Sequence, residues 1–479
     1  MAPCRYHVIF ILAICEMLFF GGLFYGWPSL VYVLKEESYY FDLCVHNDTS
    51  RITESVVCDK QDANLNLVYT IGSTTAFLFL LPVGIVFDWF GTRLTRILSH
   101  FILVTGLLLM LMSSPATPYL LFPGMMCLVV GGTSLYITLI QIGNLFAKHR
   151  STAAALISGS YDASAVVMLF IKLAYDAGVP LQTSFTILIS CTVIVFIPTF
   201  YLLPNGKIPW PLPPNYKSSI HCDHREDDDT KESDLSVLSH EDANQKITEE
   251  DNRYAENPYD VEFPTIKSCL RSPSFILLMF WFCMQELRLS SYTGLFNPLT
   301  VEMTGGNRQL VDHYTKVFGF IQFGVILFSP LGGMILDRNK GKPNRQPYDD
   351  LKDSALGFAT TSILFVLFAI FITIPIHRIQ YATFILCGVS KAFLFGILFG
   401  ILPVVFPFRY YGTLTGVIGL LGATVDLLQY PLYIMTQKYL NNNFLVMNII
   451  MLIACAATIA LPVYVTYHAR RLNKKANTL

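Results

Sequence analysis

The chain has 479 residues and a formal net charge of −1, and 53% of its residues are hydrophobic while only 14% are charged. Soluble globular domains carry about 25% charged residues, so this composition excludes an ordinary soluble protein. The basic residues are scattered and form no patch, which excludes a nucleic-acid-binding protein. Apolar runs of about 20 residues recur along the chain, and each is long enough to cross a bilayer.

The apolar runs predict an all-α membrane protein with twelve spans. In chain order we expect these spans at 7–34, 65–87, 94–113, 119–146, 151–176, 183–203, 274–301, 314–336, 354–375, 379–405, 411–436 and 443–467. The first run is too long for the core of a signal peptide and lacks a small-residue cleavage site. We therefore expect it to remain as the first span.

The basic residues of the connecting loops predict the orientation of the chain. The loops on one side hold most of them, at Arg93, Arg96, Lys148, Arg150, Arg338, Lys340, Lys342, Arg345, Arg409, Arg470, Arg471, Lys474 and Lys475. The opposite short loops hold few. Because positively charged loops stay in the cytoplasm, both termini are expected there, including a basic tail at 468–479.

The loop at 35–64 has two sequence features of an extracellular or lumenal segment. Cys44 and Cys58 lie in this polar segment, whereas most other cysteines lie inside apolar runs. The sequence Asn47-Asp-Thr49 between them is an acceptor for N-glycosylation. Disulfides and glycans both require an extracellular or lumenal face, so we expect a Cys44–Cys58 bridge and a glycan at Asn47 on that face.

The segment 204–273 divides the chain into two halves. It begins with a proline-rich stretch and continues with acidic runs such as Glu226-Asp-Asp-Asp229. This composition lacks the apolar residues of a folded core, so we expect a disordered cytoplasmic loop. It separates a six-helix bundle at 1–203 from a second six-helix bundle at 274–467.

One short motif occurs in both halves. Gly84-Ile-Val-Phe-Asp88-Trp-Phe-Gly91-Thr-Arg93 follows the second span, and Gly333-Met-Ile-Leu-Asp337-Arg338 follows the eighth, with Asp337 249 residues after Asp88. Two copies of a charged turn, each after an apolar helix, indicate an internal duplication, which is common among transporters. Glycine permits close helix packing, and an aspartate can pair with arginine or with a helix N-terminus.

These two turns resemble the signature loops of the major facilitator superfamily. The resemblance implies a twelve-helix fold in which two six-helix halves are related by a pseudo-two-fold axis. It also implies that Gly84, Asp88, Gly91, Arg93, Gly333, Asp337 and Arg338 act in gating between conformations. In the first copy Trp89 stands where the family pattern has a basic residue, which predicts weaker contacts between the halves at this turn.

Further stretches resemble solute carrier family 43. They are Phe24-Tyr-Gly26-Trp27-Pro28, Gln141-Ile-Gly-Asn144, Pro209-Trp-Pro-Leu-Pro-Pro214 and Phe320-Ile-Gln322-Phe-Gly-Val. The family comprises facilitators for large neutral amino acids and for purine nucleobases. The proline-rich stretch and the segment at Gln322 are similar to the equilibrative nucleobase transporter branch, whereas Leu287-Arg288-Leu289 resembles the amino-acid branch.

Polar side chains inside the spans are the candidate solute ligands, because such groups are costly in a membrane. The resemblance implies that helices 1, 4, 7 and 10 line the cavity. The residues that we favour are Gln141, Gln285, Arg288, Lys391 and Glu16, followed by Tyr292 and Gln322. An alternative for the amides is that they only bridge helices. Asp162 and Asp426 are alternatively expected to pair with Lys172, Lys391 or Arg288.

The chemistry of the solute leaves two classes open. A nucleobase is planar and neutral, and it needs aromatic platforms and side-chain amides. A zwitterionic amino acid needs a cation and an acceptor, for which Arg288 or Lys391 with Glu16 or Asp162 would serve. The branch resemblance favours a facilitative transporter of purine nucleobases such as adenine, guanine and hypoxanthine, independent of sodium and protons, with large neutral amino acids as the alternative.

Other classes of protein are less well supported by the sequence. There is no nucleotide-binding loop and no hydrolase or metalloprotease motif, so we expect neither an ATP-driven pump nor an enzyme, and no cofactor or metal. A membrane sensor that binds without transporting stays open. We expect a monomer in the plasma membrane, with a small-molecule solute and the lipid bilayer as its partners.

Overall fold

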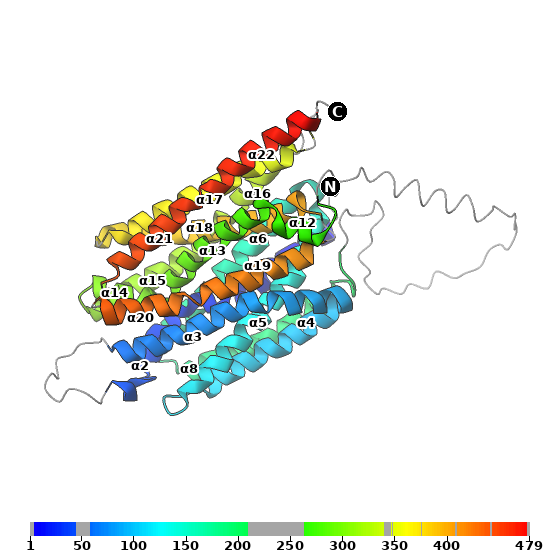
Figure 1. The fold of residues 1–479 in the computed structure, drawn as a ribbon. Helices are drawn as coiled ribbons and strands as arrows, with labels where there is room; N and C mark the ends of the chain where they lie inside the picture. The colour runs from blue at the N-terminus through cyan, green and yellow to red at the C-terminus, as the bar shows by residue number, and fades with distance from the viewer. Residues whose placement is uncertain are drawn as a thin grey trace, which may run out of the picture.

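The structure is a computed structural model that describes residues 4–44, 58–208, 263–339, 346, 348–374, 376–407, 410–440 and 443–476. All regular elements of these residues are α-helices or short 3-10 helices. The helices form one elongated bundle, and both termini lie at the same end of it (Figure 1).

The first half of the bundle contains the helices before residue 209. They are α1 (Cys4–Phe20), η1 (Leu23–Gly26), α2 (Trp27–Glu36), η2 (Phe41–Leu43), α3 (Asp59–Leu78), α4 (Leu80–Met112), η3 (Pro118–Leu120), α5 (Leu121–Ile140), η4 (Gln141–His149), α6 (Arg150–Ala163), α7 (Ala165–Asp176), α8 (Leu181–Cys191), η5 (Thr192–Val195) and α9 (Phe196–Tyr201).

The second half contains the helices after residue 262. They are α12 (Ile266–Arg271), α13 (Pro273–Gly294), α14 (Phe296–Met303), α15 (Arg308–Gly324), η6 (Val325–Leu327), α16 (Ser329–Asp337), α17 (Asp349–Thr373), η7 (His377–Ile379), α18 (Gln380–Val405), α19 (Tyr411–Asp426), α20 (Gln429–Tyr439), α21 (Leu445–Ala457) and α22 (Ala460–Ala476).

The helices account for the twelve expected spans. Among the described residues, nine helical stretches are long and apolar enough to cross a membrane. One of them, Asp59–Met112, has 54 residues and holds two consecutive spans. The bent pair α1 and α2 adds one span. Helices α13 and α14 occupy the seventh expected span, although they are not among these apolar stretches. The outer surface is apolar, with side chains such as Phe101 and Ile453 more than 60% exposed, as a bilayer requires.

A single glycine separates the second span from the third. Gly91 has φ +74° and ψ −167° inside α4, a conformation that L-residues with a side chain rarely adopt. The Gly91 position also faces Asn205, whose carbonyl oxygen would lie 2.6 Å from an added Cβ. The chain therefore reverses direction at the first signature turn without a longer loop.

The two ends of the bundle differ in chemistry. At one end, which we call the disulfide end, Cys44 and Cys58 form the expected disulfide. The opposite end, which we call the terminal end, holds both termini and the Gly91 turn (Figure 1). The expected glycosylation site Asn47 lies outside the described residues.

The segment that joins the halves is described only at its edges. Residues 209–262 lie outside the described residues, and so do Lys340, Lys342, Arg345 and Arg409. Within the range expected as loop, the structure places helix α12, which begins with a capping box between Thr265 and Ser268. Residues 205–208 pack against α4 and η4 of the first half.

Candidate functional site

The site begins with a break in the first span. The expected continuous helix at 7–34 is bent by 45° between α1 and α2, with η1 at the bend. Gly22 and Gly26 permit this because an added Cβ would lie 2.3 Å from the carbonyl oxygen of Tyr161 and 2.5 Å from Met168. The close approach of η1 to α6 and α7 directs Phe24 and Tyr25 towards the centre of the bundle.

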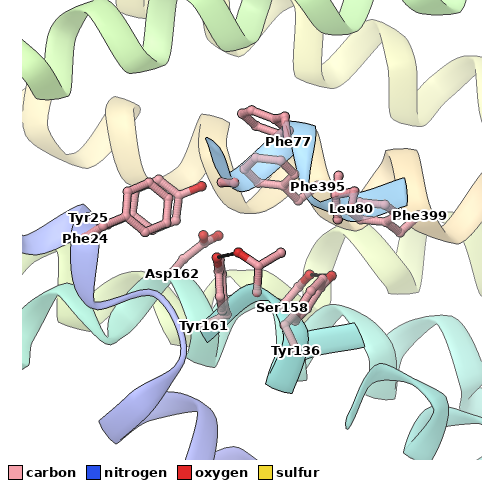
Figure 2. Close-up of a pocket in the computed structure, with 12 residues that line it drawn as sticks. Phe24, Tyr25, Phe77, Leu80, Tyr136, Ser158, Tyr161, Asp162, Phe395 and Phe399 are labelled. Carbon is pink, nitrogen blue, oxygen red and sulfur yellow. Dashed lines mark hydrogen bonds between the residues drawn. The ribbon is translucent and has the colours of Figure 1, made fainter. Parts of the chain in front are cut away.

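A cavity of about 40 Å³ lies at the centre, between the two halves. Figure 2 shows that aromatic rings surround it. The lining residues of the first half are Phe24, Tyr25, Ala76, Phe77, Leu80, Thr133, Tyr136, Ser158, Tyr161 and Asp162, and those of the second half are Phe395 and Phe399. We call this cavity the central chamber. It holds about three water molecules, because each needs about 10–15 Å³ of this kind of volume.

Hydroxyl pairs fix the rings of the central chamber. The Tyr161 and Thr133 hydroxyls lie 3.0 Å apart, and the Tyr136 and Ser158 hydroxyls lie 2.6 Å apart (Figure 2). On the opposite wall the rings of Phe395 and Phe399 are nearly parallel, with an interplanar angle of 12°. The chamber therefore offers flat apolar surfaces together with a few hydroxyl groups.

A buried ion pair joins the two halves at this chamber. Lys391 Nζ of α18 lies 3.1 Å from Asp162 Oδ1 of α6, and each side chain is less than 5% exposed. The Lys391 ammonium also lies over the ring of Tyr25. A charge buried in a membrane protein requires a partner, and here each member of the pair compensates the other.

A second cavity of about 430 Å³ leads from the chamber towards the terminal end. It shares Leu80, Tyr136 and Phe399 with the chamber lining. At its far side lies the ion pair of Asp88 and Lys207, 2.5 Å apart, whose side chains are 51% and 42% exposed. The second cavity thus extends from residues of the chamber wall to partly exposed residues at the terminal end.

At the disulfide end, ion pairs hold the halves together. Lys172 of α7 pairs with Asp312 of α15, while Lys316 of α15 lies 2.8 Å from Asp176 of α7. Two more contacts across the halves are Arg308 with Glu36 and Lys35 with Asn297. We call these residues the outer latch. The structure is therefore closed at the disulfide end and hollow at the terminal end.

A third cavity, of about 590 Å³, belongs to the second half alone. Its lining comes from α13, α14, α17, α18 and α21 and from residues adjacent to them, and it includes Tyr292 and Asn448. Since no lining residue comes from the first half, this cavity is not part of a path between the halves.

Lys391 pairs with Asp162, which lines the central chamber, but Lys391 is not itself a lining residue. Gln141 lies in the wall of the second cavity, where its amide nitrogen donates to Thr92 Oγ1 at 2.8 Å and its oxygen accepts from the backbone N–H of Ile208 at 2.8 Å. Glu16 accepts two 2.7 Å hydrogen bonds from Arg96. Arg96 is fully buried, so it does not lie in a loop as its charge had suggested.

The candidates of the seventh and eighth spans make contacts within the second half. Gln285 donates to Thr458 at 3.1 Å, and Arg288 donates to Asn448 at 3.0 Å. Gln322 donates to the carbonyl oxygen of Phe384 at 3.1 Å. Tyr292 packs edge-on against Phe296, Phe318 and Phe368. These contacts do not test whether the four side chains bind a solute, so that role stays a prediction.

The first signature turn contacts the segment that follows α9. Asp88 pairs with Lys207 and not with Arg93, while Arg93 lies over the ring of Phe200. Gly84 has no atom within 4 Å of an added Cβ, so it does not serve close helix packing in this conformation. Among the described residues, the first copy contacts side chains of the first half and the segment 205–207.

The second signature turn joins the halves directly. Asp337 Oδ2 accepts from Thr152 N at 3.1 Å and from Thr152 Oγ1 at 3.0 Å, in the first turn of α6. A carboxylate is favourable at a helix N-terminus. At Gly333 an added Cβ would lie 2.6 Å from Ser151 O. Arg338 pairs with Asp353 of α17 instead.

Most chamber residues had not been singled out from the sequence. Aromatic residues are frequent in all spans, so Tyr136 and Phe399 have no distinguishing signal, and Phe24 stands out only as part of the stretch Phe24-Tyr-Gly26-Trp27-Pro28. A weak signal existed in α6, where Ser158, Tyr161 and Asp162 are spaced i, i+3, i+4 and share one face. From the sequence, Asp162 is expected either to pair with a buried cation or to serve as the acceptor for a zwitterionic amino acid. The structure shows it paired with Lys391.

The described residues hold no cluster of three or more histidine, cysteine or acidic side chains suited to a metal ion. What they provide is two helical halves, a chamber between them and a cavity on one side, which is the arrangement of a membrane transporter. The sequence matches the family model of the Major Facilitator Superfamily over residues 9–428. The chain therefore belongs to the major facilitator superfamily.

Its similarity to individual proteins agrees with the resemblance to solute carrier family 43. The chain is 32% identical to Equilibrative nucleobase transporter 1 of Bos taurus over 95% of both chains. It is 28% identical to Large neutral amino acids transporter small subunit 3 of Homo sapiens, over 97% of this chain and 93% of the relative. These relatives are transporters, so the prediction that the chain is no enzyme is confirmed.

The contact at Gly333 can be tested against a matched glycine. Gly333→Val should lower the thermal unfolding midpoint of the purified protein by a few degrees, because overpacking costs about 1–3 kcal/mol. Gly324→Val, at a position where an added Cβ meets nothing within 4 Å, should leave the midpoint unchanged. Equal midpoints for the two variants would contradict the close contact between α16 and α6.

Proposed function

We propose that this chain is a facilitative transporter of purine nucleobases such as adenine, guanine and hypoxanthine, working by alternating access and independent of a sodium or proton gradient. The observation that supports this most is the aromatic central chamber between the halves. It carries no net charge from its ion pair, because Asp162 and Lys391 neutralise each other. The nucleobase transporter among the relatives supports the same class of solute.

The walls of the chamber suit a planar solute with polar edges, which would also need the space of the adjoining second cavity. A purine stacks on aromatic faces, and its edge offers hydrogen-bond donors and acceptors. The parallel rings of Phe395 and Phe399 form one wall, and the hydroxyls of Tyr136, Ser158 and Tyr161 lie on the other. A neutral solute also adds no uncompensated charge to this buried site. We infer that the purine binds where the chamber meets the second cavity, beside Phe399.

The asymmetry of the two ends supports a transport cycle. The structure is hollow at the terminal end and closed by the outer latch at the disulfide end. Asp176, Asp312 and Lys316 are each about 26–31% exposed. A partly exposed ion pair such as Lys316 with Asp176 contributes only about 0–1 kcal/mol, so this part of the outer latch breaks readily. Lys172 is fully buried, so its pair with Asp312 is not a surface ion pair.

The second signature turn is the proposed gate at the terminal end. The Asp337–Thr152 contact and the close packing at Gly333 join α16 to α6 across the halves. When the halves rock, this contact has to change, whereas Asp88 and Arg93 hold residues of their own half and of the 204–208 segment. We infer that the two copies of the motif have different roles, with the second acting between halves.

The proposed orientation places the terminal end in the cytoplasm. The Cys44–Cys58 disulfide at the opposite end supports an extracellular position for that end. A glycan at Asn47 would lie on the same side. We propose that the protein is a plasma-membrane monomer, with a cytoplasmic loop at 204–273 between its two bundles, and that the structure corresponds to a state accessible from the cytoplasm.

Large neutral amino acids are the second candidate solutes. Asp162 and Lys391 place an anion and a cation side by side, as the ammonium and carboxylate of a zwitterion would require. The human relative named as a large neutral amino acids transporter supports this alternative. Against it, Arg288 and Glu16 have partners away from the chamber.

The two candidates differ in a direct uptake measurement. Cells that express the chain should take up labelled adenine in a saturable manner, with the same initial rate in sodium-containing and sodium-free buffer. Labelled leucine should not enter above the level of untransfected cells. Leucine uptake without adenine uptake would overturn the nucleobase assignment and leave the amino-acid alternative.

The proposed place of the purine can be tested at Phe399. Removing an aromatic platform from a stacked base costs about 1–3 kcal/mol, so Phe399→Leu should raise the KM for adenine at least about fivefold. Phe320→Leu is the matched control, because Phe320 is 51% exposed on the outer surface. Equal KM values for these variants at equal surface expression would exclude stacking on Phe399.

A further inference from the structure

Two buried carboxylates of the second half are not used by the proposed solute site. They are Glu286 of α13 and Asp426 of α19, which are 2% and 1% exposed. These helices pack together in the second half. Within the described residues, neither carboxylate lies within 4.0 Å of a lysine, arginine or histidine nitrogen, in contrast to Asp162 and Glu16.

Neutral groups bind one side of the Asp426 carboxylate. Asp426 Oδ2 accepts from Ser73 Oγ at 2.6 Å and from Gln429 Nε2 at 3.1 Å. Gln429 also donates to Ser73 at 3.0 Å. The second oxygen, Oδ1, is buried and accepts no hydrogen bond from the described residues. Since Ser73 belongs to α3, this small network crosses from the first half to the second.

The two carboxylates lie on helices that meet at the same level. The Ser290 hydroxyl donates to Glu286 Oε1 at 3.1 Å, one helical turn along α13. One turn before each carboxylate, an added Cβ at Gly422 of α19 would lie 3.0 Å from the ring of Phe282 in α13. The other oxygen of Glu286, Oε2, is buried and has no hydrogen-bond partner among the described residues. Each carboxylate therefore has one buried oxygen without a hydrogen-bond partner among the described residues.

The surrounding charges do not neutralise a second negative charge. Lys391 is the nearby cation, and it is already paired with Asp162. Arg288 follows Glu286 by two residues, but its guanidinium donates to Asn448 and lies over Phe368. The other titratable groups that face the pair are Tyr25, Tyr69 and Cys283. Two adjacent uncompensated anions are costly in a membrane interior, whereas one bound proton removes one of them.

We propose that Glu286 and Asp426 form a site that binds one proton between them, and that this proton is required for the halves to move during transport. This proposal rests on the proposed transport function. In the protonation step, hydronium transfers its proton to one carboxylate, giving a neutral carboxylic acid and water. Loss of the proton places two like charges beside the Ser73 contact that joins the halves, and the transport rate falls.

The test compares transport at equal pH on both sides of the membrane, so that no gradient is present. In proteoliposomes, adenine exchange by the wild-type protein should slow at least about threefold between pH 6 and pH 9, as expected when an essential proton is lost. Glu286→Gln and Asp426→Asn each leave one negative charge in the pair, as the bound proton does. Both variants should therefore keep their rate across this pH range.

Glu302→Gln is the matched control, because Glu302 is an exposed carboxylate of the same half. It should keep the pH profile of the wild-type protein. A wild-type rate that does not change with pH, or variants that still slow at high pH, would overturn the proposal.

A second measurement does not depend on transport. Infrared spectroscopy of the purified protein should show a protonated carboxylic acid band at pH 6 that Glu286→Gln and Asp426→Asn each weaken or remove. A band that is present while adenine exchange is absent would refute the nucleobase assignment and keep the proton site. The absence of a band that these variants affect would refute the proton site, whatever solute the protein carries.

Discussion

The ion pair between Asp162 and Lys391 is the constraint on which the centre of this protein depends. It joins α6 of the first half to α18 of the second, with both side chains less than 5% exposed. In a membrane interior neither charge is stable alone, so the partners hold the two helices in register. The contact of Lys391 with the Tyr25 ring extends this constraint to the bend in the first span.

The bend and the ion pair together explain why the chamber lies where it does. Gly22 and Gly26 permit η1 to approach α6 and α7, which brings Phe24 and Tyr25 beside Asp162 (Figure 2). From this centre the structure is asymmetric. Ion pairs close the disulfide end, and a cavity of about 430 Å³ extends to the terminal end. Rocking of the halves about the Asp162–Lys391 pair would open the disulfide end and close the terminal end.

The sequence predicted the fold well because apolar length and internal duplication are local signals. The twelve spans and the Cys44–Cys58 bridge agree with the structure. The site was harder to predict than the fold. The spacing of polar residues shows which side chains share one face of a helix, but it does not show which other helix that face contacts. Gln285 and Arg288 point to groups inside their own half, and Gln141 binds residue 208. The chamber instead uses common aromatic residues, such as Phe399, that composition cannot distinguish.

Thermal unfolding of Asp162→Asn, Lys391→Gln and the double variant tests the central ion pair most directly. Removing one partner leaves a buried charge uncompensated, which costs about 3–5 kcal/mol, whereas removing both leaves none. Each single variant should therefore unfold at a clearly lower temperature than the wild-type protein, and the double variant should recover most of the loss. A double variant whose loss equals the sum of the two single losses would show that the residues act independently, and it would contradict this account.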